Sequence, residues 1–404
     1  MDDALLITAD RLWDASTNVI RPVVRVVGSR IDSVQGSLLA PSTCTGVRHD
    51  YPGCTILPGL IDTHVHLVMA ALFSNEEIIA QVGAESDEQL FERAAAAAAA
   101  ALRSGLTTIR DCGGRGRIIQ NLRDAIRRGD RTGPDILSCG MPITTTLGHC
   151  HWLGLVADGF DGASAAARQT LDEDADFLKV MATGGNMTAT SNPMKAQYDD
   201  ATLKAIADIG RAAGKHSAAH VLSRSALPGA VAANYRTIEH CDWRVEEYRY
   251  DFDPELARRM IDQEQYVGLT MSALARRSVV PEVRGLDIPP VRRLDLRFAC
   301  ERQMIEFGLR FTIHSDAGVR LTPINRFDLG LRAAEVELRL TPAEILRSVT
   351  ATAAAAIGLP DRGALASGKR ADLLIVEGDP LKDLSCLTNV RAVLKAGRWV
   401  DLVK

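Results

Sequence analysis

Eight short apolar segments alternate with helical segments, and this pattern constrains the fold of the chain most. The segments are the run that ends at His64 and residues 107–110, 136–139, 177–181, 216–220, 237–240, 266–270 and 310–314. The helical patterns between them include residues 87–104, 199–213, 254–263 and 292–307. Strands that alternate with helices form parallel βαβ units, and eight such units close into a barrel. The sequence therefore predicts an α/β protein built on a (β/α)8 TIM barrel.

The two ends of the chain show a second pattern, in which apolar and polar residues alternate over short stretches. It covers residues 4–34 and returns only at residues 371–376 and 390–394. Such alternation is typical of half-buried strands. We expect the ends to pair into one small β-sandwich domain, composed of residues 1–57 and 361–404, next to a barrel domain of residues 58–360.

The composition excludes several classes of partner. The chain has 404 residues, 46% of them hydrophobic, and its 47 basic and 51 acidic residues give a formal net charge of -4 without a basic stripe. We therefore expect no nucleic-acid partner. The start Met-Asp-Asp-Ala is acidic where a secretory signal is basic, and no apolar run approaches the roughly 18 residues of a membrane span. These features predict a cytoplasmic protein, and its eight single cysteines are expected to be reduced and buried.

Two histidines close the first of the eight segments. Alternate side chains of a strand share a face, so His64 and His66 can offer two imidazoles to one metal ion. A single His-x-His pair is weak evidence, because most such pairs are surface histidines or hydrogen-bonded core histidines. The metal interpretation depends on the ends of the later segments, where a barrel of this kind gathers its reactive groups.

Lys179 lies between Leu178 and Val180 within the fourth segment. A lysine on a buried strand is costly unless it is paired or modified. One interpretation is a lysine on an exposed sheet edge, although a closed barrel has no such edge. The other is a carbamate, formed from the amine and carbon dioxide, whose oxygens can bridge two metal ions.

Further polar residues close the later segments. His220 ends the fifth segment and is the candidate ligand there, whereas His216 is expected deeper in the barrel with a structural role. His240 ends the sixth segment and is either a ligand or a hydrogen-bonded core histidine. Asp316 follows the eighth segment, where a carboxylate can bind metal and accept a proton, while His314 is expected inside the barrel.

The combined pattern resembles the amidohydrolase superfamily over nearly the whole chain. The resemblance rests on Pro-Gly-Leu-Ile-Asp-Thr-His-Val-His at residues 58–66, on Lys179, His220 and His240, on Ser-Asp-Ala-Gly at 315–318 and on the closing segment 363–373. Lys-Val-Met-Ala-Thr-Gly-Gly at 179–185 and Gly-His-Cys-His at 148–151 are most similar to the imidazolonepropionase-like and Xaa-Pro dipeptidase-like branch.

The resemblance implies a centre of two divalent metal ions. His64, His66 and Asp316 would hold one ion, and His220 and His240 the second, with carboxylated Lys179 and a hydroxide between them. Zinc is the default ion for imidazole and oxygen ligands at an open site, with manganese or iron as alternatives. The hydroxide would attack a carbonyl while Asp316 takes its proton and delivers it to the leaving nitrogen. His151 would steady the oxyanion or grip the substrate; the alternative is a surface loop histidine.

Lys179 also narrows the expected chemistry. Deaminases of the superfamily typically use one metal ion without this lysine, so the resemblance favours hydrolysis of an amide, carbamate, urea or ester in a small molecule. The dipeptidase-like branch commonly has a tyrosine where this chain has Leu222. Leu222 and Arg224 are expected to contact the substrate, and the leucine leaves room for a more apolar amide. The alternatives are an Xaa-Pro or N-acyl-amino-acid dipeptidase or carboxypeptidase and, from another class, a barrel scaffold without catalysis.

Two further expectations concern loops and assembly. Residues 186–198 form either a lid or an ordinary surface loop, and residues 141–155 and 271–290 are expected to shape the pocket. Barrels of this kind often associate, so a homo-oligomer is expected.

Overall fold

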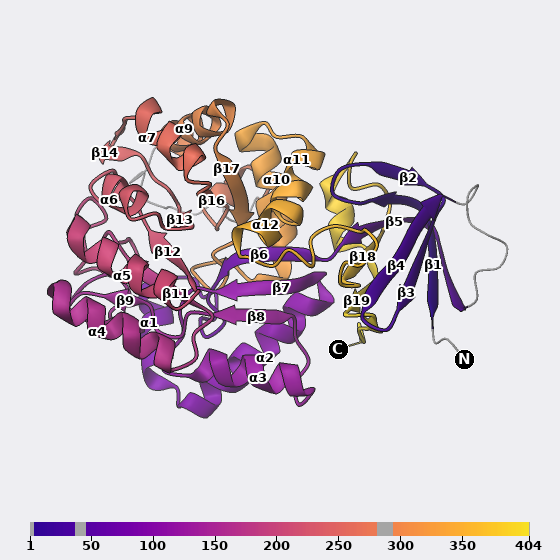
Figure 1. Ribbon diagram of the computed structural model, residues 1–404, viewed down its shortest axis with the longest axis horizontal. Coiled ribbons are helices and arrows are strands. Elements are labelled where there is room, and N and C mark those ends of the chain that lie inside the picture. Colours follow the sequence, from indigo (N-terminus) through magenta and orange to yellow (C-terminus); the bar gives the residue numbers. More distant parts are fainter. Residues whose placement is uncertain (1–3, 37–45, 281–293, 404) are drawn as a thin grey trace.

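The computed structural model describes residues 4–36, 46–280 and 294–403 and places both ends of the chain in one mixed sheet, the terminal sheet (Figure 1). Its strands are β1 (Leu5–Trp13), β2 (Asn18–Ile20), β3 (Pro22–Val27), β4 (Arg30–Gly36), β5 (Val47–Pro58), β18 (Leu373–Glu377), β19 (Val390–Lys395) and β20 (Arg398–Trp399). They follow the order β20-β19-β18-β5-β1-β3-β4, with β2 paired to β1. The antiparallel pair of β5 and β18, with Pro58 opposite Leu373, joins the two ends of the chain as expected.

The eight strands predicted for the middle of the chain are all present. They are β6 (Leu60–Val65), β7 (Leu106–Asp111), β8 (Asp135–Ser138), β11 (Phe177–Met181), β12 (His216–His220), β13 (Thr237–Glu239), β16 (Tyr266–Thr270) and β17 (Arg310–His314). One parallel sheet has the order β6-β7-β8, and the other runs from β11 through β12, β13 and β16 to β17, with the short strands β9 (Ile143–Thr144) and β10 (Leu155–Val156) at its edge.

Backbone contacts link these two parallel sheets on both sides. The Asp176 amide, just before β11, donates to the Ser138 carbonyl of β8 at 2.8 Å. On the other side Val65 of β6 forms a parallel bridge with Ala317, which follows β17. The carboxyl ends of the eight strands consequently meet on one side of the molecule, where the polar residues of the sequence pattern lie.

Helices cover the outside of the parallel strands (Figure 1). They are α1 (Asn75–Ala84), α2 (Asp87–Arg103), α3 (Ile118–Arg128), α4 (Gly159–Asp172), α5 (Asp200–Ala212), α6 (Leu227–Ala232), α7 (Pro254–Asp262), α9 (Leu294–Phe307), α10 (Phe327–Leu338), α11 (Pro342–Ser348) and α12 (Ala351–Ala356). The helices predicted at 87–104, 199–213 and 254–263 correspond to α2, α5 and α7. The helix predicted at 292–307 corresponds to α9, except that residues 292 and 293 lie outside the described residues.

Helix α2 shows why the alanine-rich segment is helical. Ser86 caps its first turn in a reciprocal pair of hydrogen bonds with Gln89, which satisfies amides that the helix leaves without partners. Alanine has the highest helix propensity, and Ala94, Ala98 and Ala101 are fully buried. Their small side chains let the helix pack closely against the strands.

One carboxylate ties the terminal sheet to the parallel strands. Asp135, the first residue of β8, forms ion pairs with Arg362 at 2.8 Å, Arg370 at 2.9 Å and Lys395 at 3.0 Å. These three cations keep the pKa of Asp135 below its usual value although its burial acts in the opposite direction. The cluster fixes the last part of the chain against the parallel strands.

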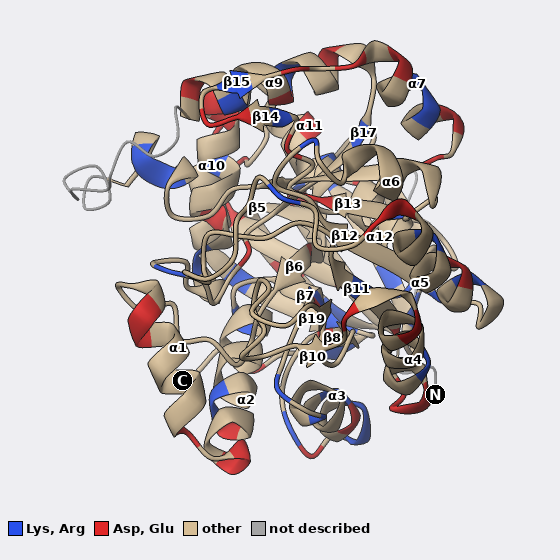
Figure 2. Ribbon diagram, turned by 90° about the vertical axis from the view of Figure 1, so that its left-hand side faces the viewer, with Lys and Arg blue, Asp and Glu red and all other residues tan. Residues whose placement is uncertain are grey.

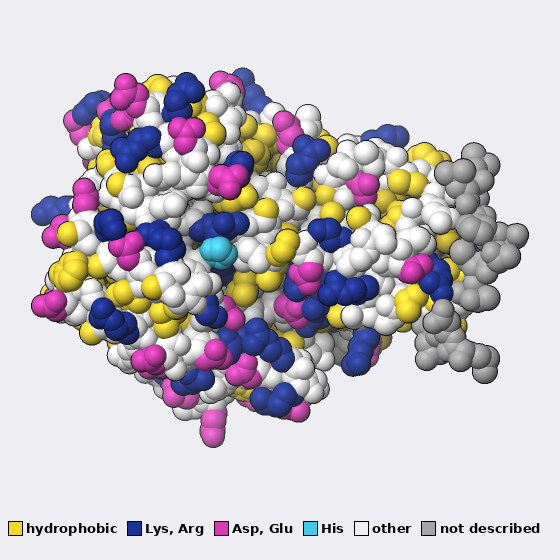
Figure 3. All heavy atoms as spheres, in the orientation of Figure 1, with side chains coloured by type: hydrophobic (Ala, Val, Ile, Leu, Met, Phe, Trp, Pro, Cys, Tyr) yellow, Lys and Arg dark blue, Asp and Glu magenta, His cyan; other side chains and the backbone are white. Residues whose placement is uncertain are grey.

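The surface mixes charges of both signs. Basic and acidic side chains are interspersed over the outer helices (Figure 2) and on the face drawn in Figure 3. Among the described residues, no helix is both long and apolar enough to pass through a bilayer. The seven described cysteines are free thiols, and all of them except the half-buried Cys386 are buried; Cys44 lies outside the described residues.

Candidate metal centre

Three of the predicted ligands meet at the carboxyl ends of β6 and β17. The Nε2 atoms of His64 and His66 lie 3.6 and 3.4 Å from Oδ1 of Asp316. One ligand atom from each residue fits within a span of 4.8 Å, which is close enough to surround one ion. The two histidines are buried, whereas the Asp316 side chain is 17% exposed and so remains accessible from the cavity described below.

The next two predicted ligands form a second pair beside the first. Nε2 of His240 lies 3.0 Å from Nδ1 of His220. The His240 ring is 5.4 Å from the His64 ring, so the two groups are neighbours. His240 and Asp316 both have left-handed backbone, with φ of 65° and 55°. For residues other than glycine this conformation costs about 1–3 kcal/mol and persists where the surrounding structure holds it, often at functional sites.

Each of the four histidines has one ring nitrogen facing an acceptor and the other facing the centre. The outer contacts are His64 Nδ1 with Glu239 (3.1 Å), His66 Nδ1 with the Gly113 carbonyl (3.1 Å), His220 Nε2 with the Gly184 carbonyl (3.3 Å) and His240 Nδ1 with the Thr270 hydroxyl (2.6 Å). A histidine that donates one N–H outward presents the lone pair of the other nitrogen inward. The four rings are therefore arranged as metal ligands are.

Electrostatics favours a neutral ring at two of these histidines, whereas at His66 the effect of burial is outweighed by Asp316, which raises the pKa of that ring. Burial, followed by the charge that Lys179 carries as an unmodified amine, lowers the pKa of His64 well below its usual value. Burial and the neighbouring His220 have the same effect on the pKa of His240. Neutral imidazole is the form that binds a metal ion. Both rings are thus in the binding form over the physiological pH range.

Lys179 lies in β11 next to these histidines. The strand register places Met181 opposite His220 and Lys179 opposite Ala218. Lys179 therefore lies two residues before the level of His220, farther from the carboxyl ends of the strands. The lysine is 1% exposed, and its Nζ has no hydrogen-bond partner among the described residues. A buried ammonium without a partner is strongly unfavourable. The site therefore fits a lysine that gains oxygen atoms and metal ligands.

A cavity of about 610 Å³ opens above this centre. All six predicted ligands line it. Its other walls are largely apolar, with charged groups near them; these residues include Met69, Met187, Leu222, Leu274, Val319, Leu321, Asp242, Arg277, Arg297 and Arg320. The expected lid contributes residues 186–189, Ser191 and Pro193 to the cavity wall. The expected pocket loops contribute His149, Cys150, residues 272–274 and Arg277, while residues 281–290 lie outside the described residues.

The structure corrects the choice of loop histidine. His149, and not His151, lines the cavity, and its ring is 4.5 Å from the His220 ring. Nδ1 of His151 instead contacts the Gly148 carbonyl at 3.0 Å within its own turn. Gly185 makes the position of His149 possible, because a Cβ at that residue would lie 2.3 Å from the ring.

Two further expectations need correction. Arg224 does not line the cavity, because its guanidinium is paired with Asp251 and, at 2.7 Å, with Asp253. His216 is the first residue of β12 and is exposed, so it lies at the end of the strand away from the cavity rather than within the barrel. By contrast Leu222 does line the cavity, and His314 is fully buried as expected.

The sequence interpretation missed a buried ion pair beneath the centre. Glu239 is fully buried and lies 2.5 Å from Nη2 of Arg110. Burial alone would raise the pKa of Glu239, but the Arg110 charge lowers it to about 2, so the carboxylate is ionised. The available signal was a charged residue of opposite sign within each of two predicted parallel strands, which suggests a pair.

A scan against models of known families identifies the chain. The model described as "Amidohydrolase family" matches residues 55–400. The chain belongs to the amidohydrolase family. Amidohydrolases generally use divalent metal ions, which agrees with the His64, His66 and Asp316 group.

Individual relatives agree with this assignment. Ochratoxinase of Aspergillus niger is 25% identical over 431 residues, covering 99% of this chain and 85% of the relative. Imidazolonepropionase of Idiomarina loihiensis is 25% identical over 390 residues, covering 90% and 86%. The crystal structure of a Xaa-Pro dipeptidase with bound methionine in the active site has a TM-score of 0.83 at 26% identity, covering 98% and 100%.

These comparisons confirm the resemblance found in the sequence, including its branch. They assign a TIM-barrel-type α/β fold and the activity of a hydrolase on carbon–nitrogen bonds. An amidohydrolase of this kind is an enzyme, which argues against the scaffold alternative.

Proposed function

We propose that this amidohydrolase is a binuclear metal enzyme that hydrolyses the amide, carbamate or ester bond of a small molecule. The supporting observation is the buried Lys179 amine, which has no hydrogen-bond partner in the described part of the chain. It shares the cavity with candidate ligands from four other strand ends. His64, His66 and Asp316 would hold one divalent ion and His220 and His240 the other, with carboxylated Lys179 between them. Zinc suits this set of nitrogen and oxygen ligands.

The residues that line the cavity would have different roles in the hydrolysis. Bound divalent ions would polarise the scissile carbonyl and lower the pKa of water toward neutrality. Asp316, which is accessible from the cavity, would take the proton of the attacking water and pass it to the leaving nitrogen. His149 lines the cavity. It would steady the oxyanion or bind the substrate, the role first expected of His151. Leu222 offers an apolar wall to the substrate.

The proposed function goes with the two-domain architecture that the sequence pattern predicts. Residues 58–360 form a closed catalytic (β/α)8 barrel, and residues 1–57 and 361–404 form a composite β-sandwich domain. The parallel sheets linked on both sides and the shared terminal sheet support this division. The homo-oligomer and the cytoplasmic location stay predictions.

Removal of metal tests the proposed centre directly. Dialysis against a strong chelator is expected to abolish hydrolysis of an amide and ester panel, because the attacking water then keeps its ordinary pKa. Addition of Zn²⁺ should restore activity in proportion to the metal bound, up to two ions per chain by mass spectrometric metal analysis. Full activity in protein shown to be free of metal would contradict the proposal.

The Arg320 side chain favours a second candidate function. This candidate is a dipeptidase that acts on an Xaa-Pro or N-acyl-amino-acid substrate. Arg320 lines the cavity four residues after Asp316, and its guanidinium contacts the Phe73 ring at 5.8 Å. Among the described residues no carboxylate forms an ion pair with it, whereas Arg297 in the same cavity is paired with Glu301. A free guanidinium beside an apolar cavity suits the carboxylate of such a substrate. The similarity to the solved structure of a Xaa-Pro dipeptidase supports this candidate.

The substitution Arg320→Met separates the two candidates. If a substrate carboxylate pairs with Arg320, kcat/KM for N-acyl-amino acids is expected to fall about 10- to 100-fold. The kcat/KM for the matching amino acid amides, which lack that charge, should stay unchanged. Arg128→Met on the surface of α3 is the control. An equal loss for both substrate series would contradict recognition of the carboxylate by Arg320.

A further inference from the structure

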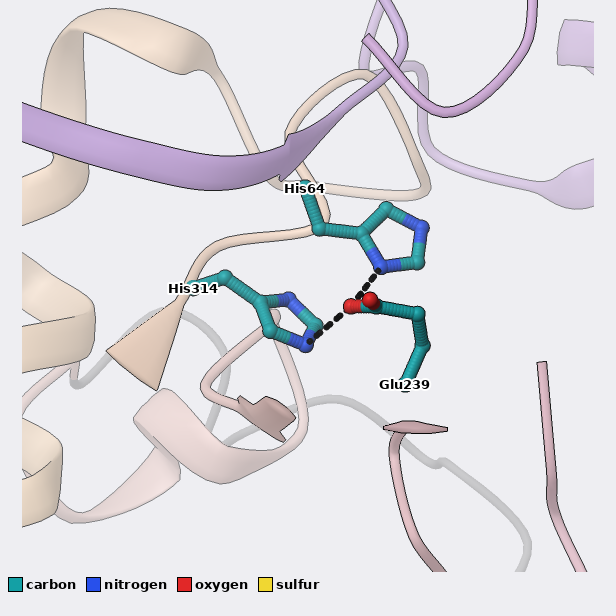
Figure 4. A group of neighbouring side chains, drawn as sticks. All are labelled: His64, Glu239 and His314. Carbon is teal, nitrogen blue, oxygen red and sulfur yellow. Dashed lines mark hydrogen bonds and ion pairs between the residues drawn. The ribbon is translucent and has the colours of Figure 1, made fainter. Parts of the chain in front are cut away.

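Glu239 is the one charged acceptor among the four groups that contact the outer ring nitrogens of the histidines. The other three are the Gly113 and Gly184 carbonyls and the Thr270 hydroxyl. Figure 4 shows the Glu239 carboxylate between the rings of His64 and His314. Its Oε2 is 3.1 Å from Nδ1 of His64 and 3.6 Å from Nε2 of His314.

The other oxygen of this carboxylate, Oε1, is fixed by two hydrogen bonds. Oε1 accepts hydrogen bonds from Nη2 of Arg110 and from the Thr237 hydroxyl, both at 2.5 Å. Arg110 is itself fixed, since its Nη1 donates to Thr237 at 3.0 Å and its Nε to the Thr63 carbonyl at 2.6 Å. Both oxygens therefore have defined directions, and the carboxylate cannot turn away from His64 without leaving a buried charge unpaired.

A glycine provides the space for this arrangement. A Cβ on Gly268 of β16 would lie 2.8 Å from Oε2 of Glu239 and 2.8 Å from Nε2 of His314. Real Cβ atoms do not approach other atoms so closely, so any larger residue at this position would displace the carboxylate or the ring. The position of Glu239 thus depends on residues from several strands.

We propose that Glu239 is a positioning residue, which fixes the proton of His64 on Nδ1 and thereby presents the Nε2 lone pair to the metal ion. An ionised carboxylate only accepts hydrogen bonds, so the His64 nitrogen that faces it must donate. The opposite nitrogen is the one that lies 3.6 Å from Asp316 at the centre. This inference rests on the proposed metal centre and adds the group that prepares one of its ligands.

The same three residues could instead hold an ion among themselves, since His64, Glu239 and His314 offer ligand atoms within 4.8 Å of one another. Two observations favour the positioning role. Glu239 and His314 do not line the cavity, so an ion would have no direct entry to them. Oε1 is also occupied by Arg110, whose positive charge would repel a cation at that place.

The test compares Glu239→Gln with Asp372→Asn. Both changes turn a buried carboxylate that pairs with an arginine into an amide, but Asp372 pairs with Arg370 beside the terminal sheet. In Glu239→Gln the amide oxygen must face Arg110, which can only donate, so the NH2 group faces His64 and favours the wrong tautomer. The Zn²⁺ affinity of metal-free protein, measured by competition with a chromophoric chelator, is expected to fall about 10- to 100-fold. In Asp372→Asn it should equal that of wild type although the melting temperature falls.

The outcomes distinguish failure of the positioning role from failure of the metal centre. Wild-type Zn²⁺ affinity in Glu239→Gln, an equal loss in Asp372→Asn, or the loss of one bound ion at unchanged affinity would overturn the positioning role. Absence of Zn²⁺ binding in the wild-type protein would instead refute the metal centre itself. If Glu239→Gln does not fold, Gly268→Ala serves as the second variant, because its Cβ displaces the carboxylate. Weaker Zn²⁺ binding is again expected, and unchanged binding would again overturn the inference.

Discussion

Replacement of Lys179 by methionine is expected to reduce kcat by about 10³-fold or more, because the proposed metal centre would lose the ligand that this lysine supplies and with it most of the stabilisation of the developing charge. The same change should stabilise the metal-free protein by about 1–3 kcal/mol, since it replaces a buried amine, to which no described residue offers a hydrogen bond, by an apolar side chain of similar length. Chemical denaturation of metal-free protein and steady-state kinetics measure the two effects.

Opposite signs for stability and activity distinguish this role from a structural one. A lysine that only supported the fold would lower both quantities when replaced. Lys204→Met on the exposed face of α5 is the matched control and should change neither activity nor metal content. In the wild type, ¹³C-labelled bicarbonate should give a carbamate resonance, because the amine adds to carbon dioxide and loses a proton. Persistence of that resonance in Lys179→Met, or unchanged kcat, would contradict the assignment.

Asp316→Asn is expected to lower kcat by about 10³-fold while KM changes little, because the amide can occupy the same space but cannot take a proton. Oδ1 lies 3.6 and 3.4 Å from the Nε2 atoms of His64 and His66, and the amide oxygen of the substituted side chain is expected to take the same place. The change is therefore aimed at the proton rather than at the shape of the cavity.

Metal analysis and pH dependence complete this second test. Asp316→Asn should keep at least the ion held by His220 and His240, whereas Asp316→Ala should lose metal as well. In the metal-free protein the burial of Asp316 acts to raise its pKa, but the hydrogen bond and charge of a protonated His66 lower it overall. In the wild type the carboxylate is thus ionised at neutral pH, and kcat should fall as the pH drops through its pKa. If Asp316→Asn and the wild type have equal kcat at saturating metal, Asp316 is not the proton carrier.

The strands and the candidate ligands at their ends could be predicted because both depend on local pattern. A strand ends where its apolar run ends, and parallel strands of one barrel bring these ends together wherever the helices lie between them. His64, His66, Lys179 and Asp316 could accordingly be assigned from residue type and position alone, and the structure places them around one cavity.

The loop contacts could not be predicted in the same way. His149 and His151 are two residues apart in one turn, and only the packing of His149 against His220 and Gly185 decides which of them lines the cavity. Arg224 is withdrawn by Asp251 and Asp253, which follow a different strand. Free Arg320 becomes notable only because no carboxylate of the described residues reaches it.

The sequence alone therefore determined the barrel-type fold, the family and the residues that could bind metal, because these follow from a repeated period and from chemistry at strand ends. Only the tertiary structure decided how these residues are supported. The pairing of Arg110 with Glu239, and of Glu239 with His64, joins residues that are 129 and 175 positions apart in the chain. Such contacts depend on the angles and distances between packed elements, which no local pattern of residues contains.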